Sequence, residues 1–289
     1  MTTADGRGRL SVEEATLAYD RRVISRGLSL TIPDGSFTVI VGPNGCGKST
    51  LLRSLARLLA PGNGAVLLDG RTVQSYPSKE FARAVGFLPQ SATAPDNITV
   101  ADLVARGRFP HQGPLHRWTR RDEDALWAAM TATRTDELAD RPVEELSGGQ
   151  RQRVWIAMAL AQETPILLLD EPTTFLDIAF QLEVLDLLHD LREQGRTIVA
   201  VLHDPNHAAQ YATHLIAMAG GEIVAEGDPR TIITTELIAR VFGIDSTILT
   251  DPVAGTPLVI PRGRRNGSAP DPAAPADDSG ATVPPALRP

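Results

Sequence analysis

The chain has 289 residues, of which 42% are hydrophobic and 22% are charged, and its formal net charge is −7 at pH 7. This length and composition allow one large or two small domains with a sizeable core, whereas the acidic balance argues against a general affinity for nucleic acid, which needs a basic surface. The single cysteine, Cys46, excludes an internal disulfide and a cysteine-cluster metal site.

Neither a targeting segment nor a membrane span is expected from the sequence. The first ten residues contain no apolar core of the kind that a secretory signal requires. A run of roughly 18 or more apolar residues, which a membrane-spanning helix needs, does not occur. If the protein acts at a membrane, we therefore expect it to act through a partner.

The first 90 residues predict strands and one helix. Residues 10–19 and 37–42 alternate in polarity as strands do. The leucine spacing over 49–59 predicts an amphipathic helix. Residues 64–70 and 84–90 predict further strands, so this part of the chain is expected to be rich in β-structure.

The character of the sequence changes between residues 91 and 163, where β-branched runs are few. A helix is predicted over 119–132, with Thr119 as its N-cap and Asp122 three residues later as in a capping box. We interpret this segment as a mostly helical insertion.

Strand character returns after the insertion. Residues 165–172 and 196–204 are apolar without alternation, and residues 181–195 between them have helical periodicity. Such an order predicts parallel strands buried on both faces. Residues 214–227 predict a hairpin about two central glycines.

A phosphate site is predicted where Gly42, Gly47, Lys48 and Ser49 satisfy the pattern G-x-x-x-x-G-K-[ST] between a strand and a helix. Glycines let the backbone N–H groups point at phosphate oxygens, and the helix adds its positive end. Only two of the 28 lysine and arginine residues are lysines. Lys48 is one of them. A compact ammonium fits among the inward-pointing N–H groups of this loop, whereas a planar guanidinium does not. The alternative is a glycine-rich turn that happens to precede a helix. The pattern itself would arise by chance in about one or two chains per thousand.

Polar groups follow three predicted strands and complete the expected site. Asp170 and Glu171 end a buried strand, where Asp170 could hold Mg²⁺ and Glu171 could act as general base towards water. His203 could contact the terminal phosphate and the attacking water, and Gln90 could sense the metal or the water. The alternatives are an acidic pair that caps the strand in solvent and a histidine with a structural role.

The segment 146–162, LSGGQRQRVWIAMALAQ, resembles the signature of the ATP-binding-cassette ATPases. The resemblance extends from about residue 10 to residue 243 and includes seven features in family order. They are Tyr19, the phosphate loop, Gln90, the signature, the Asp170–Glu171 pair, the loop ending at Asp177, and His203.

This resemblance implies an α/β fold with a P-loop NTPase core. The core is a mixed sheet with parallel strands at its centre, joined by an antiparallel β subdomain and the helical insertion over about 91–163. The ATPase domain is expected over 8–262. Residues 263–289, rich in Pro and Ala, are expected to be a disordered tail.

The resemblance also implies a head-to-tail homodimer. Ser147, Gly148 and Gly149 begin a helix whose N–H groups and hydroxyl form a second anion site. In the family, Ser147 and Gly149 complete the nucleotide site of the other subunit, and Asp177 lies at that interface. Tyr19 resembles the aromatic residue that stacks on adenine, although an ordinary strand tyrosine is the alternative.

The expected cofactors are ATP and Mg²⁺. The expected nucleotide-binding residues are Tyr19, Gly42, Pro43, Asn44, Gly45, Cys46, Gly47, Lys48, Ser49, Thr50, Gln90, Ser147, Gly148, Gly149 and Gln150. Ser49, Gln90 and Asp170 are expected at the metal, and Lys48, Glu171 and His203 are the expected catalytic residues.

The chain has one cassette, no long coiled coil and no fused span, which favours a separate ATPase subunit of a transporter. Residues 107–113, GRFPHQG, and residues 151–188 resemble ATPase subunits of ferric-siderophore importers, with vitamin B12 and haem importers as near relatives. The implied partners are two transmembrane permease subunits, with a substrate-binding protein engaged indirectly, at the cytoplasmic face of the membrane. The competing class is a nucleotide-dependent switch without transport.

Overall fold

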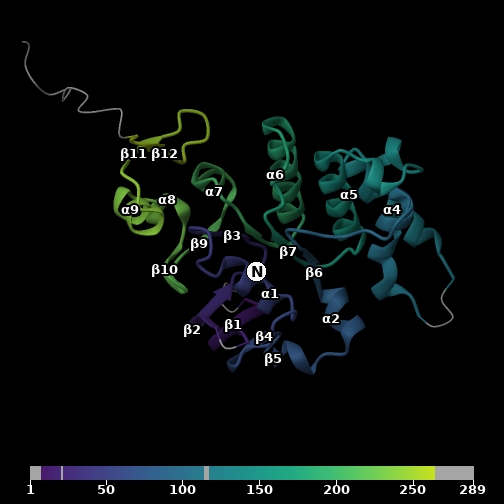
Figure 1. Cartoon of the computed structure of the whole chain (residues 1–289), viewed down its shortest axis with the longest axis horizontal. Coiled ribbons are helices and arrows are strands. Elements are labelled where there is room, and N and C mark those ends of the chain that lie inside the picture. The colour runs from purple at the N-terminus through teal and green to yellow at the C-terminus, as the bar shows by residue number, and fades with distance from the viewer. Residues whose placement is uncertain (1–7, 21, 114–116, 264–289) are drawn as a thin grey trace, which may run out of the picture.

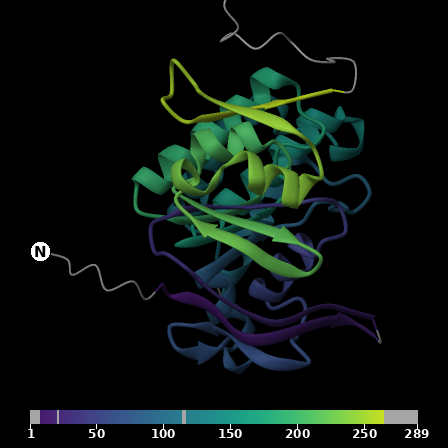
Figure 2. The same ribbon diagram turned by 90° about the vertical axis from the view of Figure 1, so that its left-hand side faces the viewer.

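The computed structural model describes residues 8–20, 22–113 and 117–263. A six-stranded sheet lies between a smaller antiparallel sheet on one side and helices on the other (Figure 1). Turned by 90°, the antiparallel strands lie at one end of the molecule and the hairpin formed by the last two strands lies at the opposite end (Figure 2). Among the described residues, none of the helices combines the length and apolarity needed to cross a bilayer.

The antiparallel sheet has the strand order β2-β1-β4-β5. Its members are β1 (Leu10–Tyr19), β2 (Arg22–Ile32), β4 (Asn63–Leu68) and β5 (Arg71–Thr72). The predictions for β1 and β4 are confirmed, but β2 was not predicted. Its alternation is interrupted because Gly27 has a φ of 60° and the pairing of β1 with β2 contains register shifts.

The six-stranded sheet has the order β10-β9-β3-β8-β7-β6. Its members are β3 (Phe37–Val41), β6 (Val85–Leu88), β7 (Ile166–Asp170), β8 (Thr197–Val201), β9 (His214–Ala219) and β10 (Glu222–Gly227). The five strands from β9 to β6 are parallel, whereas β10 pairs antiparallel with β9. The predicted mixed sheet with a parallel centre and the predicted hairpin are therefore confirmed.

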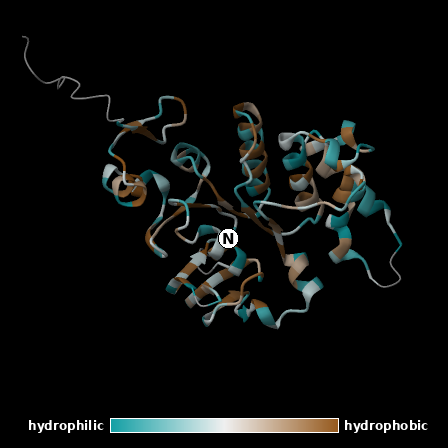
Figure 3. Ribbon diagram, viewed as in Figure 1, coloured by the Kyte–Doolittle hydropathy of each residue, from teal (hydrophilic) through white to brown (hydrophobic). Residues whose placement is uncertain are grey.

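Side chains of the central strands alternate between two hydrophobic cores. In β7, Leu167 and Leu169 face the core shared with the helices, while Ile166 and Leu168 face the core shared with the antiparallel sheet. All five residues of β7 and of β8 are buried, which explains their unalternating apolar sequences. Hydrophobic colour accordingly concentrates along the central strands (Figure 3).

Helices of the core flank the sheet and follow its strands. They are α1 (Lys48–Leu55), α2 (Ser78–Ala84), α6 (Ile178–Glu193), α7 (Pro205–Tyr211), α8 (Pro229–Ile232) and α9 (Thr235–Phe242), with a short 3-10 helix at Val73–Ser75. Helix α1 ends four residues earlier than the predicted limit of 59, because Arg57 adopts a left-handed φ of 61°. The hairpin of β11 (Ser246–Thr250) and β12 (Pro257–Pro261) was not predicted, nor were α2 and α7–α9.

The segment 91–163 is helical, as predicted. It contains α3 (Val100–Ala105), α4 (Arg120–Ala132), α5 (Gly148–Ala161) and 3-10 helices at Arg106–His111, Asp136–Leu138 and Val143–Glu145. Thr119 caps α4 in a capping box with Asp122, which confirms that prediction. The disordered tail predicted from residue 263 falls, beyond that residue, outside the described residues, and the division of the chain at 262 stays a prediction.

Candidate nucleotide site

The phosphate-loop pattern lies between the end of β3 and the start of α1. Gly42 has a φ of 153° and Gly47 a φ of 107°, both in the region that favours glycine. A Cβ on Gly42 would lie only 2.2 Å from the Met218 carbonyl oxygen. A side chain at this position is therefore excluded by backbone conformation and by close approach of β9.

Lys48 is 5% exposed, and its ammonium lies within the curve of this loop. Its Nζ donates to the carbonyl oxygens of Gly42 and Pro43 at 2.8 and 2.9 Å. Both acceptors are neutral carbonyl oxygens, so this side chain also suits an anion with several oxygen atoms.

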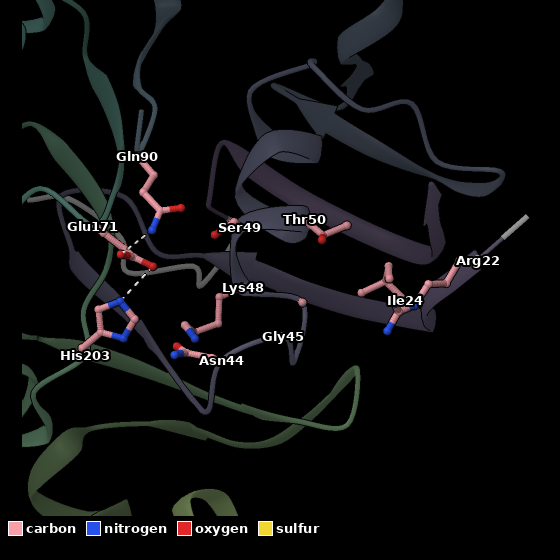
Figure 4. A pocket seen from close by; sticks show the side chains of 11 residues that line it. Arg22, Ile24, Asn44, Gly45, Lys48, Ser49, Thr50, Gln90, Glu171 and His203 are labelled. Carbon is pink, nitrogen blue, oxygen red and sulfur yellow. Dashed lines mark hydrogen bonds and ion pairs between the residues drawn. The ribbon is translucent and has the colours of Figure 1, made fainter. Parts of the chain in front are cut away.

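A cavity of about 430 Å³ opens beside Lys48 (Figure 4). Gln90, Glu171 and His203 lie on one side of it, Arg22 and Ile24 lie on the other, and Lys48 lies between the two groups. Among the residues that the structure describes, those lining the cavity are Arg22, Ile24, Asn44, Gly45, Gly47, Lys48, Ser49, Thr50, Gln90, Glu171 and His203.

Ser49 in the first turn of α1 and Asp170 at the end of β7 are hydrogen-bonded to each other. Ser49 Oγ donates to Asp170 Oδ1 at 2.8 Å, whereas Asp170 Oδ2 has no hydrogen-bond partner among the described residues. Asp170 is fully buried, and this burial raises the pKa of its carboxyl, although the Ser49 hydroxyl acts in the opposite direction.

A hydroxyl beside a buried carboxylate oxygen without a partner suits Mg²⁺, which prefers oxygen ligands. The described part of the chain contains no group of three or more His, Cys, Asp or Glu side chains that could hold a metal. The protein donors thus fit a Mg²⁺ ion that takes most of its ligands from phosphate and water, as this ion usually does.

Glu171 is held by three neighbours at the end of β7. Its Oε2 accepts from Gln90 Nε2 at 2.7 Å and from Thr174 Oγ1 at 3.3 Å, and its Oε1 lies 2.8 Å from His203 Nε2. Glu171 is 8% exposed and has a left-handed φ of 55°, a strained conformation that persists only where neighbours enforce it. The structure therefore brings three of the predicted strand-end residues into one cluster.

Two residues of β2 line the cavity although the sequence did not predict them. The described residues that line the cavity include Arg22 and Ile24 of β2 but not Tyr19. Tyr19 is 40% exposed, and its hydroxyl accepts a hydrogen bond from Arg53 at 3.1 Å. Stacking of Tyr19 on adenine stays a prediction, while Arg22 and Ile24 were missed because their strand was not recognised.

The signature residues lie outside this cavity. Ser147 caps α5, where its Oγ accepts from Gln150 N at 3.2 Å and Gln150 Oε1 accepts from Ser147 N at 3.0 Å. The described residues that line the cavity do not include the segment 147–150. Asp177 caps α6 by accepting from Phe180 N at 3.0 Å. Roles of Ser147, Gly149 and Asp177 between subunits stay predictions.

A glycine-rich loop between a strand and a helix, together with acids at the end of another parallel strand of the same sheet, defines the P-loop nucleoside triphosphatases. Residues 25–174 match the family model described as ABC transporter, and the chain belongs to that family. It is therefore an ATP-binding and ATP-hydrolysing cassette.

The comparisons with individual proteins agree with this placement. The chain is 58% identical over 257 residues to the ferric enterobactin transport ATP-binding protein FepC of Escherichia coli K12, covering 89% of this chain and 95% of FepC. It resembles an inward-facing metal-chelate type ABC transporter with a TM-score of 0.76 at 30% identity, covering 89% of this chain and 98% of that one. It also resembles the dimeric cassette MJ0796 bound to ADP and Pi. The TM-score is 0.69 at 28% identity, and the match covers 76% of this chain and 98% of that one.

Proposed function

We propose that this protein is the ATP-hydrolysing subunit of an importer for ferric siderophores or related iron complexes. The hydrogen-bonded cluster of Glu171, Gln90 and His203 facing the Lys48 cavity carries the hydrolytic part of this proposal. The identity to FepC over nearly the whole length of both chains supports the cargo class. A vitamin B12 or haem importer is the alternative cargo assignment.

Hydrolysis uses the groups around the cavity in distinct roles. Lys48 binds the outer phosphates, and Ser49, Asp170 and Gln90 are the groups that would hold Mg²⁺, which neutralises phosphate charge when bound. Glu171 takes a proton from the water whose oxygen attacks the γ-phosphorus, and the bond from that phosphorus to the β–γ bridging oxygen breaks. His203 orients Glu171 and the water.

The protein works as a head-to-tail homodimer. Ser147 and Gly149 of one copy complete the phosphate site of the other, and Asp177 lies at the interface. The absence of 147–150 from the described cavity lining and the dimeric state of MJ0796 support this arrangement. Phe175 and Ile178 on either side of Asp177 are 77% and 75% exposed, which fits a surface that a second copy covers.

The ATPase dimer binds two permease subunits at the cytoplasmic face of the membrane, and contacts the substrate-binding protein only indirectly. Part of the expected contact segment 107–113 is internal, because Arg108 and Pro110 are buried. Phe109 is 63% exposed, and the Lys79 ammonium lies 4.9 Å from the centre of its ring. Phe109 is therefore the residue of this segment best placed for the permease.

A Glu171→Gln variant tests the proposed hydrolysis. It is expected to bind ATP, to dimerise more tightly and to hydrolyse at least about 100-fold more slowly, because the amide cannot take the proton. Glu137→Gln, at an exposed carboxylate in the helical segment, is the matched control and is expected to retain the parental rate. Parental hydrolysis by Glu171→Gln would show that the base is another group.

Transport itself needs a second experiment. Purification from membranes is expected to yield the ATPase with two polytopic subunits, and iron-starved cells lacking the gene are expected to lose uptake of ferric enterobactin or another ferric siderophore. Recovery without membrane partners would favour a nucleotide-dependent switch. Loss of vitamin B12 or haem uptake alone would overturn the cargo assignment.

A further inference from the structure

Gln152 joins the signature helix to the loop that carries Glu171. It lies in the second turn of α5, is 8% exposed, and its Nε2 donates to the Pro172 carbonyl oxygen at 3.1 Å. Since a carbonyl oxygen can only accept, the amide nitrogen of Gln152 must face it. This hydrogen bond thus connects the helical segment to the residue that directly follows Glu171.

The loop that receives this bond holds Glu171 in a strained conformation. Glu171 and Phe175 both have left-handed φ values, 55° and 67°. A non-glycine residue keeps such a conformation only when surrounding contacts outweigh its cost. The loop is anchored at its far end by Gln181, whose Nε2 donates to the Leu176 carbonyl oxygen at 3.0 Å. Gln152 is the corresponding anchor at the near end.

Helix α5 also lies beside the loop residues that come after Pro172. A Cβ built on Gly148 would lie 3.9 Å from Phe175 Cβ, and one built on Gly149 would lie 3.6 Å from Leu176 Cδ2, both ordinary contact distances. One turn further, the Arg153 guanidinium lies 4.3 Å from the centre of the Phe180 ring. The start of α5 therefore lies beside the loop at Pro172, Phe175 and Leu176, with Gln152 at the end nearest Glu171.

We propose that Gln152 is a positioning residue for hydrolysis, acting through Pro172 to hold the Glu171 carboxylate against Gln90 and His203. The inference rests on the proposed role of Glu171. Loss of the amide leaves the Pro172 carbonyl without its buried donor and releases the near end of the strained loop. A displacement of the carboxylate by about 1 Å lowers turnover by up to about 100-fold without contact with nucleotide.

The test compares Gln152→Met with Gln162→Met in the full-length ATPase. Methionine keeps the side-chain length but removes the donor. Gln162 lies just after the other end of α5, and its Nε2 donates to the Ala82 carbonyl oxygen at 2.6 Å, so it is the matched control. We expect Gln152→Met to lower kcat about 10-fold or more with KM changed less than about 2-fold, and Gln162→Met to keep both. Equal kcat in the two variants, or a loss confined to KM, would overturn the proposal.

A double variant separates this proposal from the role of Glu171. If Gln152 acts through Glu171, adding Gln152→Met to Glu171→Gln lowers the single-turnover rate less than about 2-fold further. If the two substitutions instead lowered the rate by the product of their separate effects, the positioning role would be overturned. Near-parental hydrolysis by Glu171→Gln alone would overturn the proposed role of Glu171 as the base. If Gln152→Met folds poorly, Gln152→Asn replaces it, because asparagine keeps the amide but is one methylene shorter. This variant is expected to show the same fall in kcat with unchanged ATP affinity. An unchanged kcat would contradict the proposal.

Discussion

Arg108 Nε lies 3.0 Å from Asp122 Oδ1, and both side chains are almost completely shielded from solvent. The same guanidinium donates to the Ala161 carbonyl oxygen at 2.7 Å and to Glu163 at 2.8 Å. It therefore joins the 3-10 helix Arg106–His111 to the first turn of α4 and the last turn of α5. Such a buried pair fixes the mutual placement of helices more than it adds net stability.

Arg108→Met is expected to lower the free energy of unfolding by about 3–5 kcal/mol, because it removes the buried guanidinium that pairs with Asp122 and Glu163. Denaturation with urea measures the change. Arg121→Met is the control, since Arg121 is 78% exposed and reaches Glu163 only at 3.6 Å, and it is expected to change the free energy by less than about 1 kcal/mol. Similar losses in the two variants would contradict the interpretation.

Gly107→Ala is expected to destabilise the helical segment by about 1–3 kcal/mol through overpacking. A Cβ on Gly107 would lie 2.2 Å from the Met158 carbonyl oxygen of α5, so the two helices would have to separate. Thermal unfolding measures the effect. Gly62→Ala is the control, because the nearest atom to its Cβ would be the Thr16 carbonyl oxygen at 3.8 Å. An unchanged midpoint of thermal unfolding for Gly107→Ala would show that the neighbouring atoms can move apart at little energetic cost.

Asp170→Asn is expected to weaken ATP binding in the presence of Mg²⁺ by about 10-fold or more, because an amide is a poorer ligand for this ion than a carboxylate. Binding in EDTA is expected to change less than about 2-fold, since Lys48 and the loop N–H groups remain. Titration with ATP under both conditions measures the difference. A loss of equal size in EDTA would indicate a structural role for Asp170.

The half-buried His214 is expected to make the free energy of unfolding fall on mild acidification. Burial lowers the pKa of its imidazole below the ordinary value of 6.5, although Glu226 acts in the opposite direction. Because the unfolded chain then binds the proton more readily than the folded one, the contribution is present above about pH 6.5 and is lost as the pH falls towards the lowered pKa. The free energy of unfolding of the parent is expected to fall more between about pH 7 and 5 than that of His214→Gln. An equal fall in the free energy of unfolding of the parent and of His214→Gln over this pH range would contradict this expectation.

Most of the central sheet could be predicted because its residues repeat one physical requirement. Strands β7 and β8 are buried on both faces, so their apolar sequences are continuous and easily recognised. Strand β2 lacks such a pattern, since Gly27 and the register shifts break its alternation. The cavity residues Arg22 and Ile24 were missed for the same reason.

The chemical groups of the site could be predicted, but their contacts could not. Glycine spacing and strand ends indicated Lys48, Asp170 and Glu171. The bond between Gln90 and Glu171 joins residues 81 positions apart, and it depends on β6 lying next to β7 in the sheet. Strand order of this kind is a property of the packed fold that local sequence patterns do not contain.

The alternation of β7 between two cores has a consequence for how this protein tolerates change. Asp170 is the last residue of β7, whose leucines are sorted between opposite sides of the sheet, so the sorting also sets which way Asp170 points. Deleting one residue within β7 would exchange the two rows and turn that carboxylate away from Ser49. Insertions and deletions in these strands should therefore be far more damaging to ATP hydrolysis than exchanges of one aliphatic side chain for another.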